Sequence, residues 1–181
     1  MPPHALLPHP DTAPGPLEAL AVTVTPEKDA LRLDYRLSGA VARLALPATE
    51  PAARRDGLWR HTCCEVFVQG DDAPAYREFN FSPAGPWQAY GFTAYRQGGT
   101  LDPAQAPDIV AQPVPGGLHV RVRLPRADLP PGRRLRLGLT AVVEARDGSL
   151  SYWALAHAPG KADFHHPDTF VLTHDLPDPT P

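Results

Sequence analysis

Prolines and glycines interrupt this chain too often for any long helix to form. The 181 residues include 24 prolines and 14 glycines, and no stretch keeps a 3.6-residue apolar period without one of them intervening. Between these interruptions apolar and polar residues alternate, as in ALRLDYRL at 30–37 and LHVRVRL at 118–124. This alternation is typical of half-buried β-strands. Helical turns are expected only at 17–20 and near 126–129.

About nine such strands must bury their apolar faces against one another. A lone sheet would leave one hydrophobic face in water, so the sequence predicts an all-β sandwich or barrel. With 43% apolar residues the chain has enough material for a core. We expect one domain at 17–175, a loose proline-rich arm at 1–16 and a loose tail at 176–181.

Charge and composition narrow the class of partner. A formal charge of −3 argues against binding to nucleic acid, because a phosphate backbone favours a basic surface. No apolar run approaches the roughly 20 residues of a membrane helix, and the first residues do not resemble a signal peptide. Cys63 and Cys64 are adjacent, so they point to opposite faces of a strand and predict no disulfide. A cytoplasmic location is expected, without membrane or nucleic-acid partners.

The segment 58–96 carries the most informative pattern. Glu65 lies in the run TCCEVFV, where both neighbours favour burial and a carboxylate needs a partner or a function. Strand alternation and antiparallel register place Glu65, Glu78 and Asn80 on the same face. The set expected on this face is Trp59, His61, Glu65, Tyr76, Glu78, Asn80, Trp87 and Tyr95. Aromatic rings mixed with polar acceptors favour a small-ligand surface; an ordinary exposed sheet face is the alternative.

Three strings resemble a known family. LWRHTCCEVFV (58–68), YREFNFSPAGPWQAYGFTAYR (76–96) and SYWALAHAPGKADFHHPDTFVL (151–172) are similar to bacterial DOMON-like domains, which are related to family 9 carbohydrate-binding modules. The resemblance implies a two-sheet antiparallel β-sandwich of jelly-roll or immunoglobulin-like form and a non-catalytic role in binding sugar or haem. The positions that match the family's motifs are Trp59, Glu65, Glu78, Asn80, Trp153 and His157.

The predicted function is therefore binding of a carbohydrate or other small polar ligand. Trp59 and Trp153 would stack on it, with Trp87 on the same surface. Hydrogen bonds from the ligand's hydroxyls would go to Glu65, Glu78, Asn80 and His157. A haem-binding redox domain and a protein-interaction module are the alternatives.

Cofactors and catalysis are not expected. Haem-binding relatives commonly use an axial methionine, and the only methionine here is Met1. Haem and calcium nevertheless remain alternatives. His165, His166 and Asp163 are candidate metal ligands, although their spacing matches no compact zinc motif. Glu65 and Glu78 could form the acid/base pair of a glycoside hydrolase, but the expectation is that the chain is not an enzyme.

Overall fold

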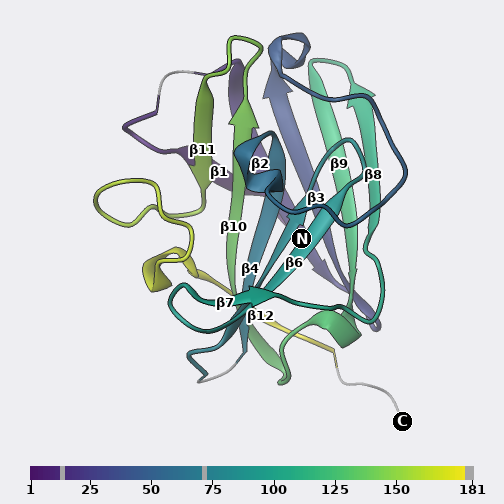
Figure 1. Cartoon of the computed structure of the whole chain (residues 1–181), viewed down its shortest axis with the longest axis vertical. Helices are drawn as coiled ribbons and strands as arrows, with labels where there is room; N and C mark the ends of the chain where they lie inside the picture. The colour runs from purple at the N-terminus through teal and green to yellow at the C-terminus, as the bar shows by residue number, and fades with distance from the viewer. Residues whose placement is uncertain (13–14, 71–72, 178–181) are drawn as a thin grey trace.

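Short alternating segments form a two-sheet β-sandwich in the computed structural model, which describes residues 1–12, 15–70 and 73–177 (Figure 1). Within these ranges the strands are β1 (His4–Pro8), β2 (Leu17–Pro26), β3 (Ala30–Gly39), β4 (Cys63–Gly70), β5 (Tyr76–Phe81), β6 (Trp87–Ala94), β7 (Gln97–Thr100), β8 (Asp108–Val114), β9 (Gly117–Pro125), β10 (Arg134–Glu144), β11 (Leu150–Ala154) and β12 (Leu172–Asp175). The all-β prediction is confirmed.

Helical structure in the described residues is limited to 3-10 turns. They are η1 (Val41–Arg43), η2 (Leu58–Arg60), η3 (Arg126–Asp128) and η4 (Pro167–Thr169). The turn expected near 126–129 is therefore present, whereas 17–20 belongs to β2. Among the described residues, no helix is long or apolar enough to cross a bilayer.

The strands divide into two antiparallel sheets. Sheet A has the order β1-β2-β3-β9-β8, and sheet B has the order β7-β6-β5-β4-β10-β11, with β12 also paired to β10. The apolar positions of both sheets meet in one large core. Tyr35 of β3 crosses this core, and its hydroxyl donates to the backbone oxygen of Glu65 in β4 at 2.6 Å. This bond ties the two sheets together directly behind the outer face of β4.

The first residues differ from the expected loose arm. His4–Leu6 pair with β2 in sheet A, and Leu7 and Pro8 pair with β11 in sheet B. One short strand therefore links the edges of both sheets. The proline-rich composition suggested disorder, but prolines are compatible with an edge strand, where not every backbone N–H is needed for pairing. Residues 13 and 14 of this predicted arm lie outside the described residues.

The predicted tail also begins inside the fold. Leu176 is buried in the main core, and its backbone N–H donates to the oxygen of Arg133 at 2.6 Å. The core contact explains why this residue is held in place. Residues 178–181 of the predicted tail lie outside the described residues.

Candidate functional site

The outer face of sheet B, which points away from sheet A, is covered by other parts of the chain. The segment 155–171, yellow-green in Figure 1, follows β11 and contributes Phe164 and Phe170 to a second apolar cluster. Phe67 of β4 and Tyr76 of β5 complete much of this cluster from the sheet. Beside it lies a pocket of about 640 Å³. This volume is within the usual range for small-molecule sites.

Two buried acids, Glu65 and Glu78, line the base of the pocket, and Asn80 lies beside them, bonded to Glu78; these three side chains are together called the floor. Glu65 of β4 lies directly opposite Asn80 of β5, and Phe67 lies opposite Glu78. Glu65 is 1% exposed, Asn80 is 0% exposed and Glu78 is 5% exposed. Asn80 Nδ2 donates to Glu78 Oε1 at 2.8 Å. Two nearly fully buried acids thus lie close together, and the amide of Asn80 is hydrogen-bonded to one of them, Glu78.

Thr140 of β10 supports the floor from the next strand. It pairs with Glu65, and its hydroxyl donates to Glu65 Oε2 at 3.0 Å. Burial raises the pKa of Glu65 well above its usual value, the charge of Glu78 adds to the rise, and the Thr140 bond opposes it. Burial likewise raises the pKa of Glu78 to about 7, against the hydrogen bond from Asn80 and the charge of Arg96. Both carboxyls therefore retain protons more readily than exposed ones.

Aromatic side chains form the mouth and walls. Trp59, on η2 just before β4, lines the mouth and is 47% exposed. Two more aromatic walls, Tyr90 and Phe92, come from β6. Tyr90 lies opposite Glu78 in the β5–β6 pairing, so its side chain points to the same face of the sheet, and Phe92 follows two residues later on that face. Tyr152 of β11 and Phe164 line the pocket as well. Flat apolar walls above a polar floor suit a ligand that has both an apolar face and hydroxyl edges.

The rim of the pocket carries charge of both signs. Arg96 lines it from the turn between β6 and β7, and its Nη2 pairs with Asp163 Oδ1 at 2.8 Å. Among the described residues Arg96 is the one non-glycine residue in the left-handed region, with φ of 55°. Such backbone positions often accompany functional sites. His9, Asp11 and Lys161 also line the pocket.

His165 closes one side of the pocket. Its Nδ1 lies 2.9 Å from the hydroxyl of Tyr76, and its Nε2 lies 3.6 Å from Glu78 Oε2. Burial lowers the pKa of His165 to about 4, with a further contribution from the charge of Arg96. The imidazole is therefore neutral at pH 7 and does not neutralise the acids of the floor.

The structure brings part of the predicted set together. Trp59, Glu65 and Glu78 line one pocket, and Asn80 lies beside them, hydrogen-bonded to Glu78. The register between β4 and β5 is the one that alternation predicts. Trp59 reaches the site from a 3-10 turn instead of a strand.

The prediction that Trp87 lies on the ligand-binding face is wrong. It lies opposite Phe81, packs in the main core between the sheets and does not share a face with Glu78. The sequence of β6 is ambiguous because it has aromatic residues on both faces. Tyr90 and Phe92 occupy the pocket face that was expected to hold Trp87.

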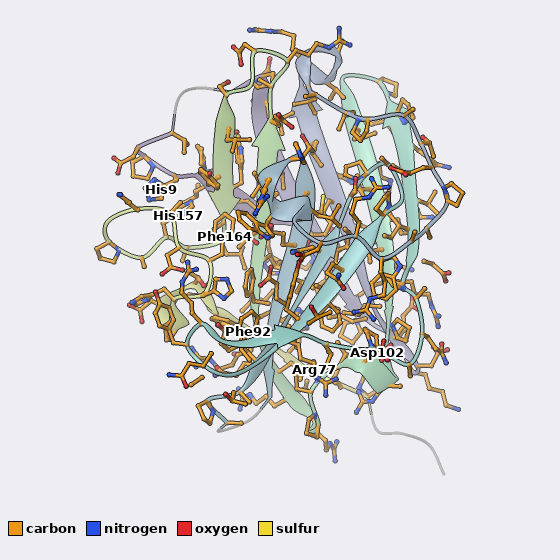
Figure 2. The ribbon with its side chains drawn as sticks, viewed as in Figure 1. His9, Arg77, Phe92, Asp102, His157 and Phe164 are labelled. Carbon is orange, nitrogen blue, oxygen red and sulfur yellow. The ribbon has the colours of Figure 1, made fainter. Side chains whose placement is uncertain are left out.

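Trp153 and His157 also lie outside the pocket lining. Trp153 packs in the main core, and its Nε1 donates to Ser151 Oγ at 3.0 Å. The outer face at this point of β11 belongs to its neighbour Tyr152. His157 Nε2 lies 2.8 Å from the Leu7 oxygen. Its ring packs on His9, 4.8 Å between centroids, so it positions a pocket residue (Figure 2).

The candidate metal ligands are engaged elsewhere. Asp163 accepts hydrogen bonds from Tyr95 and Arg96, and His166 Nδ1 accepts from the Asp168 backbone N–H as the cap of η4. Within the described part of the chain, no group of three or more His, Cys, Asp or Glu side chains is arranged to hold a metal ion. The three candidate ligands therefore do not converge on one point in the described structure.

The two histidines that line the pocket each have at least one ring nitrogen engaged by the protein. Nδ1 of His165 contacts Tyr76 and its Nε2 faces Glu78, so neither nitrogen points freely into the pocket. Nδ1 of His9 accepts from the Asp11 backbone N–H. Met1 is 68% exposed. The expectation that the chain uses no cofactor stays a prediction.

Several pocket residues were not predicted from the sequence. His9 and Asp11 follow β1 and reach the pocket only because β1 joins both sheets. Phe164 and Lys161 belong to the long connection after β11, whose path alternation does not specify. Tyr152 was detectable, since it alternates with Trp153 and one of the two must face outward.

Comparison with family models and with curated protein sequences finds no match. Solved structures do match. A protein from Bacteroides uniformis, to which a carbohydrate-binding role has been attributed, gives a TM-score of 0.64 at 12% identity, over 95% of this chain and 86% of that one.

A family 9 carbohydrate-binding module from Caldicellulosiruptor kristjanssonii also matches. Its complex with cellotriose gives a TM-score of 0.58 at 10% identity, over 88% of this chain and 74% of that chain. Its complex with glucose gives 0.58 at 9% identity, over 92% and 83%. At these identities the similarity establishes a shared β-sandwich fold of the carbohydrate-binding-module type.

Proposed function

We propose that this chain is a non-catalytic domain that binds a small carbohydrate in the pocket on the outer face of sheet B. The observation that carries the proposal is the pairing of a buried acceptor floor, formed by Glu65 and Glu78, with aromatic walls that include Trp59 and Tyr90. The proteins of similar fold include a module in complex with cellotriose and with glucose, which supports a sugar as the ligand.

The chemistry of a sugar ring suits this arrangement. One face of the ring presents C–H groups that pack on an indole or phenol ring, and the edges present hydroxyls. Hydroxyls that donate to a carboxylate form charge-assisted bonds, which are stronger than neutral ones. Trp59 is half exposed at the mouth, so it is available for stacking without disturbing the core. The pocket volume of about 640 Å³ suits a mono- or disaccharide better than a long chain.

The placement of the two acids argues against hydrolysis. In glycoside hydrolases two carboxyls flank the scissile bond from different sides. Glu65 and Glu78 come from adjacent strands of one sheet and would meet a ligand from the same side. A binding role therefore accounts better for the pair than general acid/base catalysis does.

Isothermal titration calorimetry with glucose, N-acetylglucosamine and cellobiose tests the proposal. We expect binding of at least one sugar at millimolar or tighter affinity, competed by a second member of the panel. Absence of heat and of competition across the panel at pH 8 would contradict it.

A further inference from the structure

Two oxygens in the pocket floor are buried without a hydrogen-bond partner among the described residues. They are Glu65 Oε1 and Asn80 Oδ1. The two side chains lie directly opposite each other in the β4–β5 pairing, where Cβ atoms are about 5 Å apart. An unpaired buried polar atom costs about 1–3 kcal/mol. Because the two side chains face each other across neighbouring strands, one explanation can account for both unpaired oxygens.

The other contacts of these side chains fix their orientation. Glu65 Oε2 already accepts from the Thr140 hydroxyl at 3.0 Å, and Asn80 Nδ2 already donates to Glu78 Oε1 at 2.8 Å. Turning the amide of Asn80 over would place its oxygen against the Glu78 carboxyl and lose that bond. With Glu65 ionised, its Oε1 and Asn80 Oδ1 are both acceptors and cannot form a hydrogen bond with each other. One proton on Glu65 Oε1 would satisfy both.

The surroundings favour that proton. The uncharged groups near the floor are the Cys63 thiol, two residues before Glu65 on β4, and the phenols of Tyr76 on β5 and Tyr90 on β6, all of which carry no charge at pH 7. His165 is neutral for the reason given above. The remaining titratable or charged groups that line the pocket or its rim are His9, whose Nδ1 accepts from the Asp11 N–H, and Asp11, Arg96, Lys161 and Asp163.

None of these rim groups offsets the charge of Glu65. No hydrogen bond or ion pair joins Glu65 to a cation among the described residues. The cation Arg96 opposes the rise in the pKa of Glu78 and forms an ion pair with Asp163, but it does not contact Glu65. An ionised Glu65 would therefore be a buried, unpaired charge, which is far less favourable than the neutral acid.

We propose that Glu65 is held as a neutral carboxylic acid whose Oε1–H donates to Asn80 Oδ1, which completes a relay from Thr140 through Glu65 and Asn80 to Glu78. Glu78 Oε2 is then the charged acceptor that the floor offers to a ligand. Glu65 and Asn80 act as positioning residues. They orient Glu78 and keep the floor at one negative charge instead of two.

The relay predicts that the ligand is a neutral sugar that donates hydroxyls to ionised Glu78, and this prediction rests on the proposed function. A neutral sugar that donates its hydroxyls to ionised Glu78 should bind more tightly as the pH rises. Because the pKa of Glu78 is raised to about 7, the ionised fraction grows from about one tenth at pH 6 to about nine tenths at pH 8. Apparent affinity scales with the competent fraction, so the dissociation constant should fall about ninefold over this range.

The proton itself is tested without ligand. Infrared difference spectroscopy, or 13C NMR of the glutamate side-chain carboxyls, should show a protonated carboxyl in the wild-type protein at pH 7.5. Glu65→Gln should remove most of that signal and leave only the roughly one quarter of a protonated carboxyl that Glu78, with its pKa of about 7, contributes at this pH. The midpoint of denaturation should be kept, because the Gln amide can donate to Asn80 and accept from Thr140. Glu18→Gln, an exposed site on β2, is the matched control and should leave the signal unchanged.

The outcomes separate the relay from the binding function. Ionised carboxyls only, in a wild-type protein that still binds glucose or N-acetylglucosamine, would overturn the relay and leave the function intact. A protonated signal that Glu65→Gln removes would support the relay even if no sugar bound. A dissociation constant that is flat from pH 6 to pH 8 would overturn the role assigned to Glu78.

Discussion

The two sheets each carry acidic residues in the middle of their outer faces, and the two faces treat them in opposite ways. On sheet A, Asp34 of β3 contacts three basic groups: Arg32 Nε at 3.1 Å, Arg121 Nε at 3.1 Å and His119 Nε2 at 3.0 Å. On sheet B, Glu65 and Glu78 lie under other chain segments, and among the described residues no comparable set of cations contacts them.

The pKa values follow from this difference. Desolvation alone would raise the pKa of Asp34, but hydrogen bonds from Arg121 and His119 and the charge of Arg32 lower it overall. On sheet B burial dominates and the pKa of both glutamates rises. Asp34 on the outer face of sheet A is thus the centre of an ion-pair network, whereas the acids on the outer face of sheet B line a pocket with raised pKa values. Perturbed acids in a concavity are a mark of functional sites.

The largest expected effect comes from adding charge to the covered face. Asn80→Asp places a third carboxyl in the floor with no cation to pair it. We expect a loss of about 3 kcal/mol in the free energy of unfolding at pH 8, partly recovered at pH 5. Urea denaturation measures it. Gln112→Glu on the exposed outer face of β8 is the control, with an expected change within about 0.5 kcal/mol. Equal losses of unfolding free energy in Asn80→Asp and Gln112→Glu would contradict the difference drawn between the two outer faces.

The second expected effect is a fall in wild-type stability above pH 6.5. The pKa of Glu78 is about 7 when folded and near 4.5 when unfolded, so the folded state holds more protons and loses stability as the pH rises. Glu65, with its raised pKa, acts in the same direction. His165, with its pKa lowered to about 4, acts oppositely, but only below about pH 6.5.

Denaturation curves between pH 6.5 and pH 8 should therefore show a loss of about 2–3 kcal/mol, most of it from Glu65. The double variant Glu65→Gln, Glu78→Gln should be nearly flat over the same range. A wild-type protein whose stability rises from pH 6.5 to pH 8 would show that these carboxyls are already ionised near their ordinary pKa values.

The third expected effect concerns the mouth of the pocket. Trp59→Ala removes a half-exposed ring, so the affinity for sugar should fall about tenfold, or about 1.4 kcal/mol. The free energy of unfolding should change by less than about 0.5 kcal/mol. Val110→Ala on exposed β8 should alter neither quantity. Calorimetry and urea denaturation on the same samples measure both, and unchanged sugar affinity in Trp59→Ala would remove this residue from the site.

The smallest expected effect is on the open face. Asp34→Asn should cost about 1 kcal/mol at pH 7, as expected for a partly exposed ion-pair network. Because the folded pKa of Asp34 is lowered, its contribution is present above about pH 3.8 and is lost as the pH falls through the folded value. The difference between wild type and variant should therefore shrink toward pH 3. A difference that grows with acidification would contradict the assignment.

Alternation was sufficient to predict the sheet structure and one side of the site. It placed Glu65, Glu78 and Asn80 together because facing residues on antiparallel strands share a face, and the structure has that register. It failed on β6, where Trp87 and Tyr90 are both aromatic and hydrophobicity cannot choose which faces the core. The family resemblance placed Trp153 in the site, but the structure packs it in the main core, and its neighbour Tyr152 lines the pocket instead.

The cover of the pocket was beyond sequence reasoning. His9 reaches the site because β1 joins two sheets, a long-range pairing that local pattern does not encode. Phe164 lies in an irregular segment whose path is set by packing on Phe67 and Tyr152. The raised pKa values of the floor depend on this cover, so they too could not be predicted from the strand pattern.

Backbone amide chemical-shift mapping during a glucose titration at pH 8 tests the central claim most directly. The account predicts saturable shifts at Trp59, Glu65, Glu78 and Tyr90 on the covered face of sheet B, with the amides around Asp34 and Gln112 on sheet A unchanged. Shifts gathered on the outer face of sheet A, or no saturable shift with glucose, N-acetylglucosamine or cellobiose, would contradict it.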